Sequence, residues 1–291
     1  MLRYLRARKW DVAKAVAQTV ATLKWRVEFG VSKVLALGER ACDVKELESG
    51  KTYFQGRDKE GRPCCYVHAA LHDKTITDRA LGKNLTVLTL ETGRFLLEPP
   101  QEMATIVFDM TNFGLKNMDY EFVKFLLQCM QDFYPESLGK ALVVNAPWVF
   151  NGCWAIIKPW LDPVVVSKIH FVKVDELPKH IDVAHLPEKL GGKAKDYAYV
   201  PPSEADEAEY QRLRADKDGE AKAWTAFRNA YTKFDKVTLQ WAKGDAGKLE
   251  EKPEAEKELK LTYNELSPYI RTRTIVHRRG LLNDPAFPPH A

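Results

Sequence analysis

The chain of 291 residues carries 44 Lys and Arg against 40 Asp and Glu, so its formal net charge is only +4 at pH 7. Hydrophobic residues make up 45% of the sequence and charged residues 29%, the balance of a globular protein. No apolar run approaches the roughly 20 residues needed to span a bilayer, and no dense basic stripe indicates a nucleic-acid binder. The length allows one large domain with an appended piece, or two small domains.

The first 40 residues are predicted to be helical. Asp11 is placed to cap a helix and Gly30 to end it. Between them, apolar residues recur at helical spacing, namely Val12, Val16, Val20, Leu23 and Val27. The start of the chain mixes charges into its apolar pattern and has no small-residue cleavage site, so we do not expect a secretory signal.

A basic set lies beside Trp10 near the start of the chain, and it comprises Arg3, Arg6, Arg8 and Lys9. These cations could contact phosphate headgroups or an anionic membrane surface. They could equally form a solvated helix face, and the residues alone favour that second interpretation.

A regular alternation of strands and helices follows. Gly56 to Pro63 is predicted to be a turn, because Asp, Gly and Pro recur there. The predicted strands are 63–71, 105–110, 141–144 and 168–173, and the predicted helices are 85–96, 119–133 and 151–161. Asp119 is predicted to cap the second helix, whose inward face comprises Phe122, Phe125, Leu126, Cys129, Met130 and Phe133. Strands alternating with helices of these lengths require parallel pairing with crossover helices. The predicted fold class is therefore α/β with a largely parallel sheet.

The helix predicted at 151–161 is apolar over more than one face. Trp154, Ile157 and Leu161 form one stripe, which Ile156 and Trp160 widen. Such a helix is either deep core or a cover over something apolar. Prolines bracket it, so it could move as a unit. Both interpretations remain open on these residues.

Known catalytic motifs are missing from the sequence. It has no GxSxG, no phosphate-binding GxxxxGK[ST] and no GxGxxG, so we do not expect an enzyme of those classes. Its five cysteines include no CxxC, which favours reduced thiols and argues against a structural zinc site. The pair His68 and His72, beside Asp73, could hold a metal, although ordinary buried or strand-end histidines are the favoured interpretation.

Asp109 ends a predicted buried strand. A carboxylate at the carboxyl end of a parallel strand often faces a ligand crevice. It can equally accept hydrogen bonds from loop amides, and the two interpretations are equally supported.

The character of the chain changes after Gly192. Residues 203–222 are densely charged, and residues 243–260 are predicted to form a solvated linker or a frayed helix. Between them lies an aromatic stripe at helical spacing, made of Trp224, Phe227, Tyr231, Phe234 and Trp241. This stripe is predicted to dock against the rest of the protein, and a surface for a partner protein is the alternative.

Seven segments within residues 1–200 resemble, in order and with matching spacing, the motifs of the CRAL-TRIO lipid-transfer proteins. They are Leu2–Val12, Trp25–Gly30, Asp58–Pro63, Tyr134–Leu138, Asn145–Trp148, Lys158–Ile169 and Leu186–Gly192. The most similar subgroup is the fungal-type phosphatidylinositol/phosphatidylcholine transfer proteins. The family usually has a further helix upstream, which leaves a truncated N-terminus as an open interpretation.

The resemblance implies an N-terminal helical subdomain (1–40) and a CRAL-TRIO-type lipid-binding domain (41–200), followed by a charged helical C-terminal extension (201–291). In the middle domain, a mixed, largely parallel sheet flanked by helices would enclose an apolar cavity. The implied function is non-enzymatic binding of one phospholipid and its transfer or presentation between membranes. No cofactor, metal or nucleic acid is expected. The implied location is cytoplasmic, with transient contact at membrane surfaces.

The resemblance also implies site residues. Arg8 and Lys9 match a motif that holds an inositol phosphate in relatives, and Asp109 is added as a third headgroup residue. The cavity would be lined by Tyr66, His68, Phe108, Met110, Val144, Trp148 and Phe150, and the gate helix would present Trp154, Ile157, Trp160 and Leu161. The segment Phe150–Trp154 lacks the hydroxyls that help relatives to hold choline, so phosphatidylinositol is the expected ligand.

Three alternatives accompany this expectation. The ligand could be another hydrophobic molecule, such as a sterol, a retinoid or a tocopherol-like compound. The chain could be a regulatory scaffold that binds a partner through Trp224, Phe227, Tyr231 and Phe234. It could also bind a metal or haem through His68, His72 or Tyr66.

Overall fold

The computed structural model describes residues 2–75 and 78–288, so the outermost residues of the predicted first and last domains lie outside it. The chain divides into two compact units: Met1–Val34 with Glu39–Tyr199, and Leu35–Gly38 with Val200–Ala291. The first unit thus holds both the N-terminal helices and the sheet. Among the described residues, no helix is both long and apolar enough to cross a membrane.

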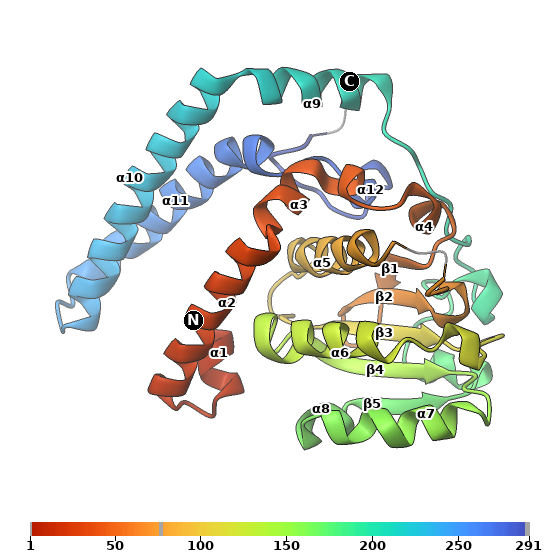
Figure 1. The fold of residues 1–291 in the computed structure, drawn as a ribbon. Helices are drawn as coiled ribbons and strands as arrows, with labels where there is room; N and C mark the ends of the chain where they lie inside the picture. Colours follow the sequence, from red (N-terminus) through yellow and green to blue (C-terminus); the bar gives the residue numbers. More distant parts are fainter. Residues whose placement is uncertain (1, 76–77, 289–291) are drawn as a thin grey trace. The chain divides into compact units, whose positions relative to one another are not determined.

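A five-stranded sheet is the centre of the first unit (Figure 1). In spatial order its strands are β1 (Thr52–Arg57), β2 (Pro63–His68), β3 (Ala104–Asp109), β4 (Leu138–Val144) and β5 (Ile169–Val172). β1 pairs antiparallel with β2, and the other pairs are parallel. The predicted α/β class with a largely parallel sheet is therefore confirmed.

The edge strand β1 was not predicted. Its alternation is interrupted at Gly56, which has φ +64° and lies where the register with β2 shifts. A side chain at Gly56 would also meet the backbone oxygen of His185 at 2.9 Å. This local irregularity explains why the segment looks like a turn in the sequence.

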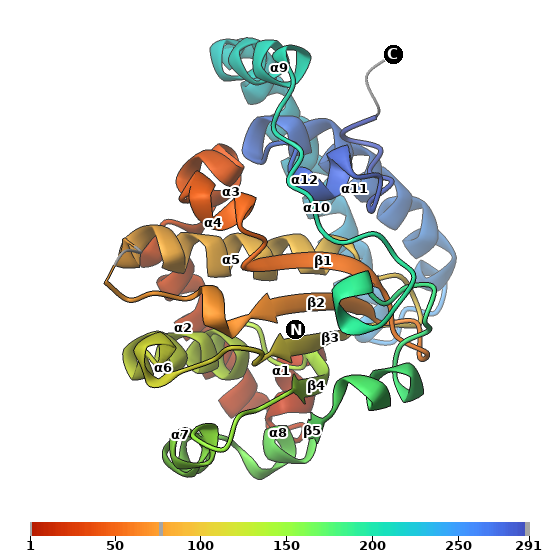
Figure 2. The same ribbon diagram turned by 90° about the vertical axis from the view of Figure 1, so that its right-hand side faces the viewer.

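The helices of the first unit are α1 (Leu2–Ala7), α2 (Val12–Phe29), α4 (Val44–Glu48), α5 (Arg79–Phe95), α6 (Tyr120–Gln128), α7 (Phe150–Ile157) and α8 (Pro163–Ser167). Helix α3 (Val31–Leu37) begins in the first unit, and its last three residues belong to the second. A π-helical turn, Cys129–Phe133, extends α6. Asp119 caps α6 as predicted, since its side chain accepts a hydrogen bond from the amide of Phe122. Helices α5, α6 and α7 line one face of the sheet, and residues 174–197 cross the other (Figure 2).

The two faces of the sheet are packed differently. On one face, Tyr53, Cys64, Tyr66, Val107, Leu142 and Val144 pack against Leu177, Ile181, Leu186 and Leu190, with every one of these side chains at most 4% exposed. Successive strand residues point to opposite faces. The residues in between, such as Val67, Phe108 and Val143, therefore point toward α5, α6 and α7.

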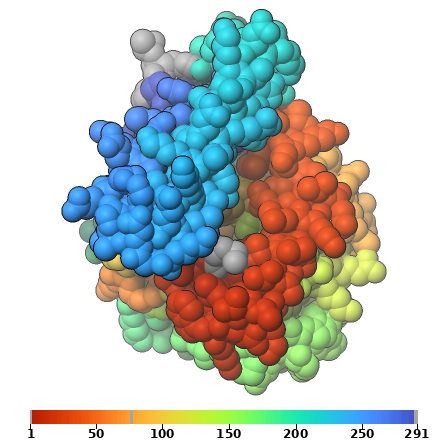
Figure 3. All heavy atoms as spheres, turned by 90° about the vertical axis from the view of Figure 1, so that its left-hand side faces the viewer, coloured from red at the N-terminus to blue at the C-terminus, as the bar shows by residue number. Residues whose placement is uncertain are grey.

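Helix α2 begins after Asp11 and ends at Gly30, as predicted; Asp11 accepts from the amide of Lys14, and Gly30 is left-handed. The apolar residues of its stripe, however, are exposed. Val27, for example, is 82% exposed. The N-terminal segment that contains α2 forms the red part of the surface in Figure 3. The helical spacing of these apolar residues correctly predicts a helix, but the residues are not on its buried face.

Polar side chains hold the buried face of α2. The side-chain amide of Gln18 donates to the carbonyl oxygens of Gln131 (3.1 Å) and Asp132 (2.9 Å), and the hydroxyl of Thr22 donates to Asp132 (3.2 Å). These carbonyls lie in the π-helical turn, where the regular helical bonding pattern ends. Trp25 stacks on Phe133 at 4.0 Å between ring centroids.

A buried ion pair completes the attachment of α2. Arg26 pairs with Glu91 of α5, whose side chain is only 4% exposed. The hydroxyl of Tyr134 also donates to Glu91 at 2.6 Å. Burial alone would raise the pKa of the Glu91 carboxyl, but the hydrogen bond from Arg26 and the charges of Arg94 and Arg26 outweigh burial and lower it. Glu91 is therefore ionised and fully partnered at neutral pH.

The second unit is helical, with α9 (Glu204–Ala215), α10 (Lys217–Ala242), α11 (Lys248–Ile270) and α12 (Ile275–Arg278). Most of the segment predicted to be a linker or frayed helix, residues 243–260, belongs to α11. Two ion pairs, Arg273–Asp206 (3.0 Å) and Arg271–Asp284 (2.6 Å), fasten the chain after α11. Part of the aromatic stripe packs within this unit, since the ring centroids of Phe227 and of Tyr263 in α11 are 5.9 Å apart.

Replacing Arg26 by Met should lower the free energy of unfolding at pH 7 by about 3 kcal/mol, because it leaves a buried carboxylate without its main partner. Arg94→Met is the matched control. Its side chain is 56% exposed and 3.4 Å from Glu91, so its loss should cost less than about 1 kcal/mol. Urea unfolding curves of the three proteins measure both values.

The same variants give a pH test. The lowered pKa of Glu91 means that its stabilisation is complete above the ordinary carboxyl value of about 4.3 and is lost as the pH falls below it. Protonation removes the unpaired charge in Arg26→Met, so the difference between variant and wild type should shrink at pH 4. An equal difference at pH 4 and pH 7 would contradict this account of α2 docking.

Candidate functional site

Two apolar cavities lie between the sheet and its covering helices. One, of about 120 Å³, is bounded by β1, β2, β3, α5 and α6, and the other, of about 200 Å³, by β3, β4, α6 and α7. Both are lined by Lys51, Val67, Phe108, Phe122 and Leu126, so they adjoin each other. Protein cores normally leave no such space. The space is suited to an apolar ligand.

Four of the predicted cavity residues line the larger cavity. Phe108 and Met110 come from β3 and the residue after it, Phe150 begins α7, and His68 ends β2. Phe150 meets Phe113 edge to face at 5.6 Å between ring centroids, which fixes the start of α7 above the cavity. The structure thus brings these residues together around one space.

The structure places the other three predicted residues elsewhere. Tyr66 and Val144 are fully buried on the opposite, solidly packed face of the sheet. Each is one residue away from a cavity-facing neighbour, and a shift of one residue reverses the face. Trp148 is 85% exposed in the loop before α7.

The predicted gate helix is α7, and it is shorter than the predicted range 151–161. It ends at Ile157 and continues as a short 3₁₀ turn, Lys158–Trp160, because Pro159 has no backbone N–H to donate. Trp154, Ile157 and Leu161 line the larger cavity. Trp160 instead lies under the ammonium of Lys124, 4.8 Å from its ring centroid.

Helix α7 also has an apolar outer surface. Ile156 is 48% exposed, and Val164 at the start of α8 is 54% exposed. No side chain caps the N-terminus of α7, and its N-cap position is Val149. The helix is therefore held mainly by apolar contacts with the larger cavity and its rim.

The predicted headgroup residues lie at opposite ends of the sheet. Arg8 and Lys9 follow α1, and Arg3 of α1 donates to the carbonyls of Glu102 and Glu136, just before β3 and β4 (Figure 1). Arg8 and Lys9 are exposed, and Arg8 donates to the side chain of Gln18 at 2.8 Å. The structure does not bring them near the carboxyl end of β3, where Asp109 lies.

Asp109 is occupied by internal hydrogen bonds. Its carboxylate accepts from the Nδ1 of His68 and from the amide of Thr111, both at 2.9 Å. Burial opposes ionisation, but these hydrogen bonds lower the pKa of Asp109 below its ordinary value. The other ring nitrogen of His68, Nε2, lies 3.4 Å from the hydroxyl of Tyr53. This chain of contacts holds the ends of β1, β2 and β3 together.

The two histidines considered as metal ligands have separate contacts: His68 bonds Asp109, and His72 stacks on Phe122. His72 does not lie on the strand, because β2 ends at His68 and a turn, Ala69–Leu71, separates them. Within the described parts of the chain, no group of three or more His, Cys, Asp or Glu is arranged to hold a metal ion. All five cysteines lie in the described part of the chain, where they are buried and form no disulfide. Burial raises the pKa of Cys42 and Cys129 to about 12, which makes these two thiols unreactive.

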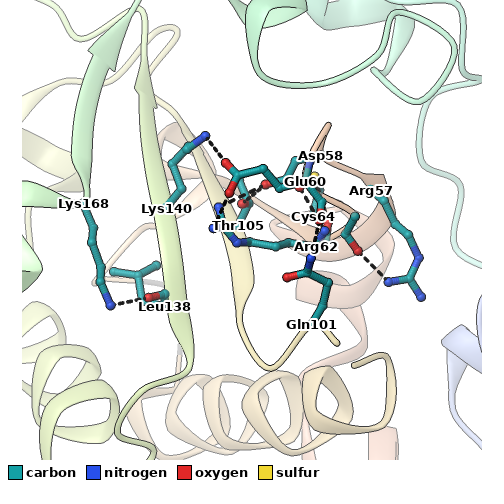
Figure 4. A network of polar contacts seen from close by, with 11 residues as sticks. Arg57, Asp58, Glu60, Arg62, Cys64, Gln101, Thr105, Leu138, Lys140 and Lys168 are labelled. Carbon is teal, nitrogen blue, oxygen red and sulfur yellow. Dashed lines mark hydrogen bonds and ion pairs between the residues drawn. The ribbon is translucent and has the colours of Figure 1, made fainter. Parts of the chain in front are cut away.

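A polar network at the amino ends of the strands explains the Asp58–Pro63 motif (Figure 4). The buried carboxylate of Asp58 accepts from the hydroxyl of Thr105 at 2.6 Å and from the amides of Glu60 and Arg62, both at 2.9 Å. Lys140 of β4 donates to Glu60 at 2.9 Å. The turn between β1 and β2 is thereby tied to β3 and β4.

Four of the five residues lining both cavities were not predicted as site residues, namely Lys51, Val67, Phe122 and Leu126. Phe122 and Leu126 carried a signal, since they lie on the face of the helix predicted to point inward. No sequence pattern pointed to Lys51. Its ammonium is buried because it pairs with the carboxylate of Glu46. A lysine before an unpredicted strand gives no reason to expect it at an apolar cavity.

Comparisons with known proteins agree with this architecture. The model of the CRAL/TRIO domain matches residues 47–192, and that of the CRAL/TRIO N-terminal domain matches residues 1–20. CRAL-TRIO domain-containing protein C3H8.02 of Schizosaccharomyces pombe is 37% identical over 97% of the chain, and phosphatidylinositol transfer protein CSR1 of Eremothecium gossypii is 36% identical over 97%. The chain spans only 65% and 67% of the lengths of these relatives.

A solved structure shows the same fold. The crystal structure of Sfh5 matches with a TM-score of 0.57 and 19% sequence identity, covering 72% of this chain and 78% of that one. At this identity the likeness extends to the fold alone.

Replacing valine by phenylalanine should affect stability differently at two neighbouring positions of β4, because the two side chains point to opposite faces of the sheet. Val143→Phe places its ring in the larger cavity, so the free energy of unfolding should change by less than about 1 kcal/mol. Val144→Phe forces the same ring into the solid face, where overpacking should cost about 1–3 kcal/mol or more. Urea unfolding of both variants is the measurement, and equal destabilisation would show that the cavity is not open space.

Proposed function

Because the chain belongs to the CRAL/TRIO family, we propose that it binds one phospholipid, foremost phosphatidylinositol, in the apolar cavities beneath α5, α6 and α7, and transfers or presents it between membranes. The observation that carries the proposal is the unfilled apolar space on one face of the sheet. A relative with 36% identity that is named a phosphatidylinositol transfer protein supports the choice of lipid.

The energetics explain why a protein is needed and a nucleotide is not. A two-chain phospholipid has on the order of 30 methylenes, and at about 0.8 kcal/mol each their exposure to water costs roughly 20 kcal/mol or more. A cavity lined by Phe, Leu, Val and Met resembles the bilayer interior, so exchange between the two is nearly neutral. The process requires no bond chemistry and therefore no cofactor beyond the bound lipid.

Helix α7 is the proposed gate. When closed, its residues Trp154 and Ile157 face the larger cavity, and its outer residue Ile156 faces solvent. Moving outward at a membrane, the helix would exchange its contacts with the cavity for contacts with lipid. A gate that opens only there also keeps a large apolar surface from being exposed in water.

Arg8 and Lys9 are proposed to contact the headgroup phosphate, because both are exposed cations and, among the residues that the structure describes, neither pairs with a carboxylate. Asp109 is already bonded to His68 and Thr111, so we assign it to the strand ends instead. The protein is proposed to act in the cytoplasm with transient membrane contact. Tyr231 and Trp241, which are 54% and 41% exposed, are the part of the aromatic stripe available for a partner.

A vesicle assay tests the proposal. Wild-type protein should move phosphatidylinositol from donor vesicles of phosphatidylcholine and phosphatidylinositol to phosphatidylcholine acceptors, well above the spontaneous rate. Val143→Phe fills the larger cavity and should lower the rate at least about tenfold, the effect of about 1.4 kcal/mol in binding. No transfer by the wild type, or full transfer by a folded Val143→Phe, would rule the function out.

The headgroup assignment has its own test. The double variant Arg8→Ala, Lys9→Ala should slow phosphatidylinositol transfer by up to about thirtyfold, since each of the two phosphate contacts is worth about 1 kcal/mol. Lys14→Ala is the matched control, because Lys14 is an exposed cation of α2 that pairs with Asp11 at 3.0 Å. If the double variant and the control behave alike, the phosphate is held elsewhere.

A further inference from the structure

A buried polar pair interrupts the apolar lining of the cavities. Lys51 lines both cavities, and His72 lines the larger one with a side chain that is 12% exposed. Both lie against the ring of Phe122: the imidazole stacks on it at 4.9 Å between centroids, and the Lys51 ammonium lies 5.6 Å from the ring centroid. Neither side chain has a part in the proposed contacts with the phospholipid headgroup or in the gate.

The backbone holds His72 in place. The side-chain amide of Asn117 donates to the carbonyls of His72 (2.8 Å) and Ala70 (3.0 Å), and the amide of His72 donates to Ala69 (3.2 Å). These bonds fasten the turn after β2 to the segment before α6. The imidazole is therefore presented to the cavity by a fixed turn.

Its hydrogen-bonding capacity is unused. Within residues 2–75 and 78–288, neither ring nitrogen of His72 has a hydrogen-bond partner. The nearest acceptor is the carboxylate of Asp119, 3.7 Å from Nε2. Buried polar atoms are normally paired, because leaving them unpaired costs their hydration without replacement. A ligand that supplies the missing bond would gain from it.

The protonation state limits what that ligand can be. Burial, and then the charge of Lys51, lower the pKa of His72, so the imidazole is neutral at pH 7. With its proton on Nε2, facing Asp119, the ring leaves Nδ1 as an acceptor that needs a donor. Lys51 is paired with Glu46, so it adds N–H donors without adding net charge. The pair thus offers one acceptor and donors, beside the carboxylate of Asp119, which would repel an anionic group.

We propose that Lys51 and His72 form a polar anchor for the hydroxyl of a neutral lipid, such as a diacylglycerol or a sterol, that occupies the same cavity. A hydroxyl donates to Nδ1 of His72 and accepts from Lys51, whereas an ester carbonyl can only accept. A phosphate or carboxylate would bring an unpaired charge into an apolar space. The inference rests on the proposed cavity but not on its phospholipid ligand.

Two matched lipid pairs test the anchor: dioleoylglycerol with its 3-O-methyl ether, and cholesterol with its methyl ether. Each lipid is offered in phosphatidylcholine vesicles, and the lipid extracted by the protein is quantified by mass spectrometry. In at least one pair, wild-type protein should extract the hydroxyl lipid about tenfold better than its ether, the effect of one hydrogen bond of about 1.4 kcal/mol. The responding pair identifies the lipid class.

Variants of His72 test whether the preference for the hydroxyl lipid over its ether depends on the anchor. His72→Leu should abolish it while the ether is still extracted, and His72→Gln, which keeps a side-chain acceptor, should retain part of it. His170→Leu is the matched control, because His170 is an exposed residue of β5, and it should leave the preference intact. Since His72→Leu removes an unpaired buried group, its unfolding midpoint should not fall.

The outcomes separate the two proposals. If wild-type protein extracts hydroxyl lipids and ethers equally, or neither, or if His72→Leu keeps the preference, the anchor is disproved. A preference that depends on His72 in a protein that transfers no phosphatidylinositol would support the anchor and reject the phospholipid function instead.

Discussion

A parallel sheet has to bury both of its faces, and this chain packs one of them solidly but leaves cavities of about 120 and 200 Å³ among the side chains on the other. On the filled face, Tyr66, Val107 and Leu142 have no exposed surface. That face fixes the strand register, because a slip of one residue would exchange the two faces. The other face is then free to be covered by α5, α6 and α7 without being packed solid, and the cavities lie there.

Because this face of the sheet is not packed solid, hydrogen bonds and ion pairs at its edges help to hold the surrounding helices and turns in place. Arg26 and Glu91 join α2 to α5, and Gln18 joins α2 to the turn after α6. At the amino ends of the strands, Asp58 ties the β1–β2 turn to Thr105. Helix α7 has no comparable fastening recorded among its described residues, which suits an element that moves.

The sequence predicted much of the fold because strands and helices have distinct periods. The parallel strands, the caps at Asp11 and Asp119 and the apolar α7 follow from local pattern. The local pattern predicts the residues lining the cavity less well. Phe108 and Tyr66 are both large strand residues, and only the register of the sheet decides which face each side chain occupies. The pairing of Lys51 with Glu46 depends on tertiary contacts that no local pattern reveals.

The central claim is that the open face of the sheet holds one lipid molecule. Native mass spectrometry of the protein purified from its own host, without detergent, tests it most directly. The account predicts a main species heavier than the bare chain by the mass of a single lipid, which is released as the protein is unfolded in the gas phase. A spectrum containing the bare chain alone, from protein that remains folded, would contradict it.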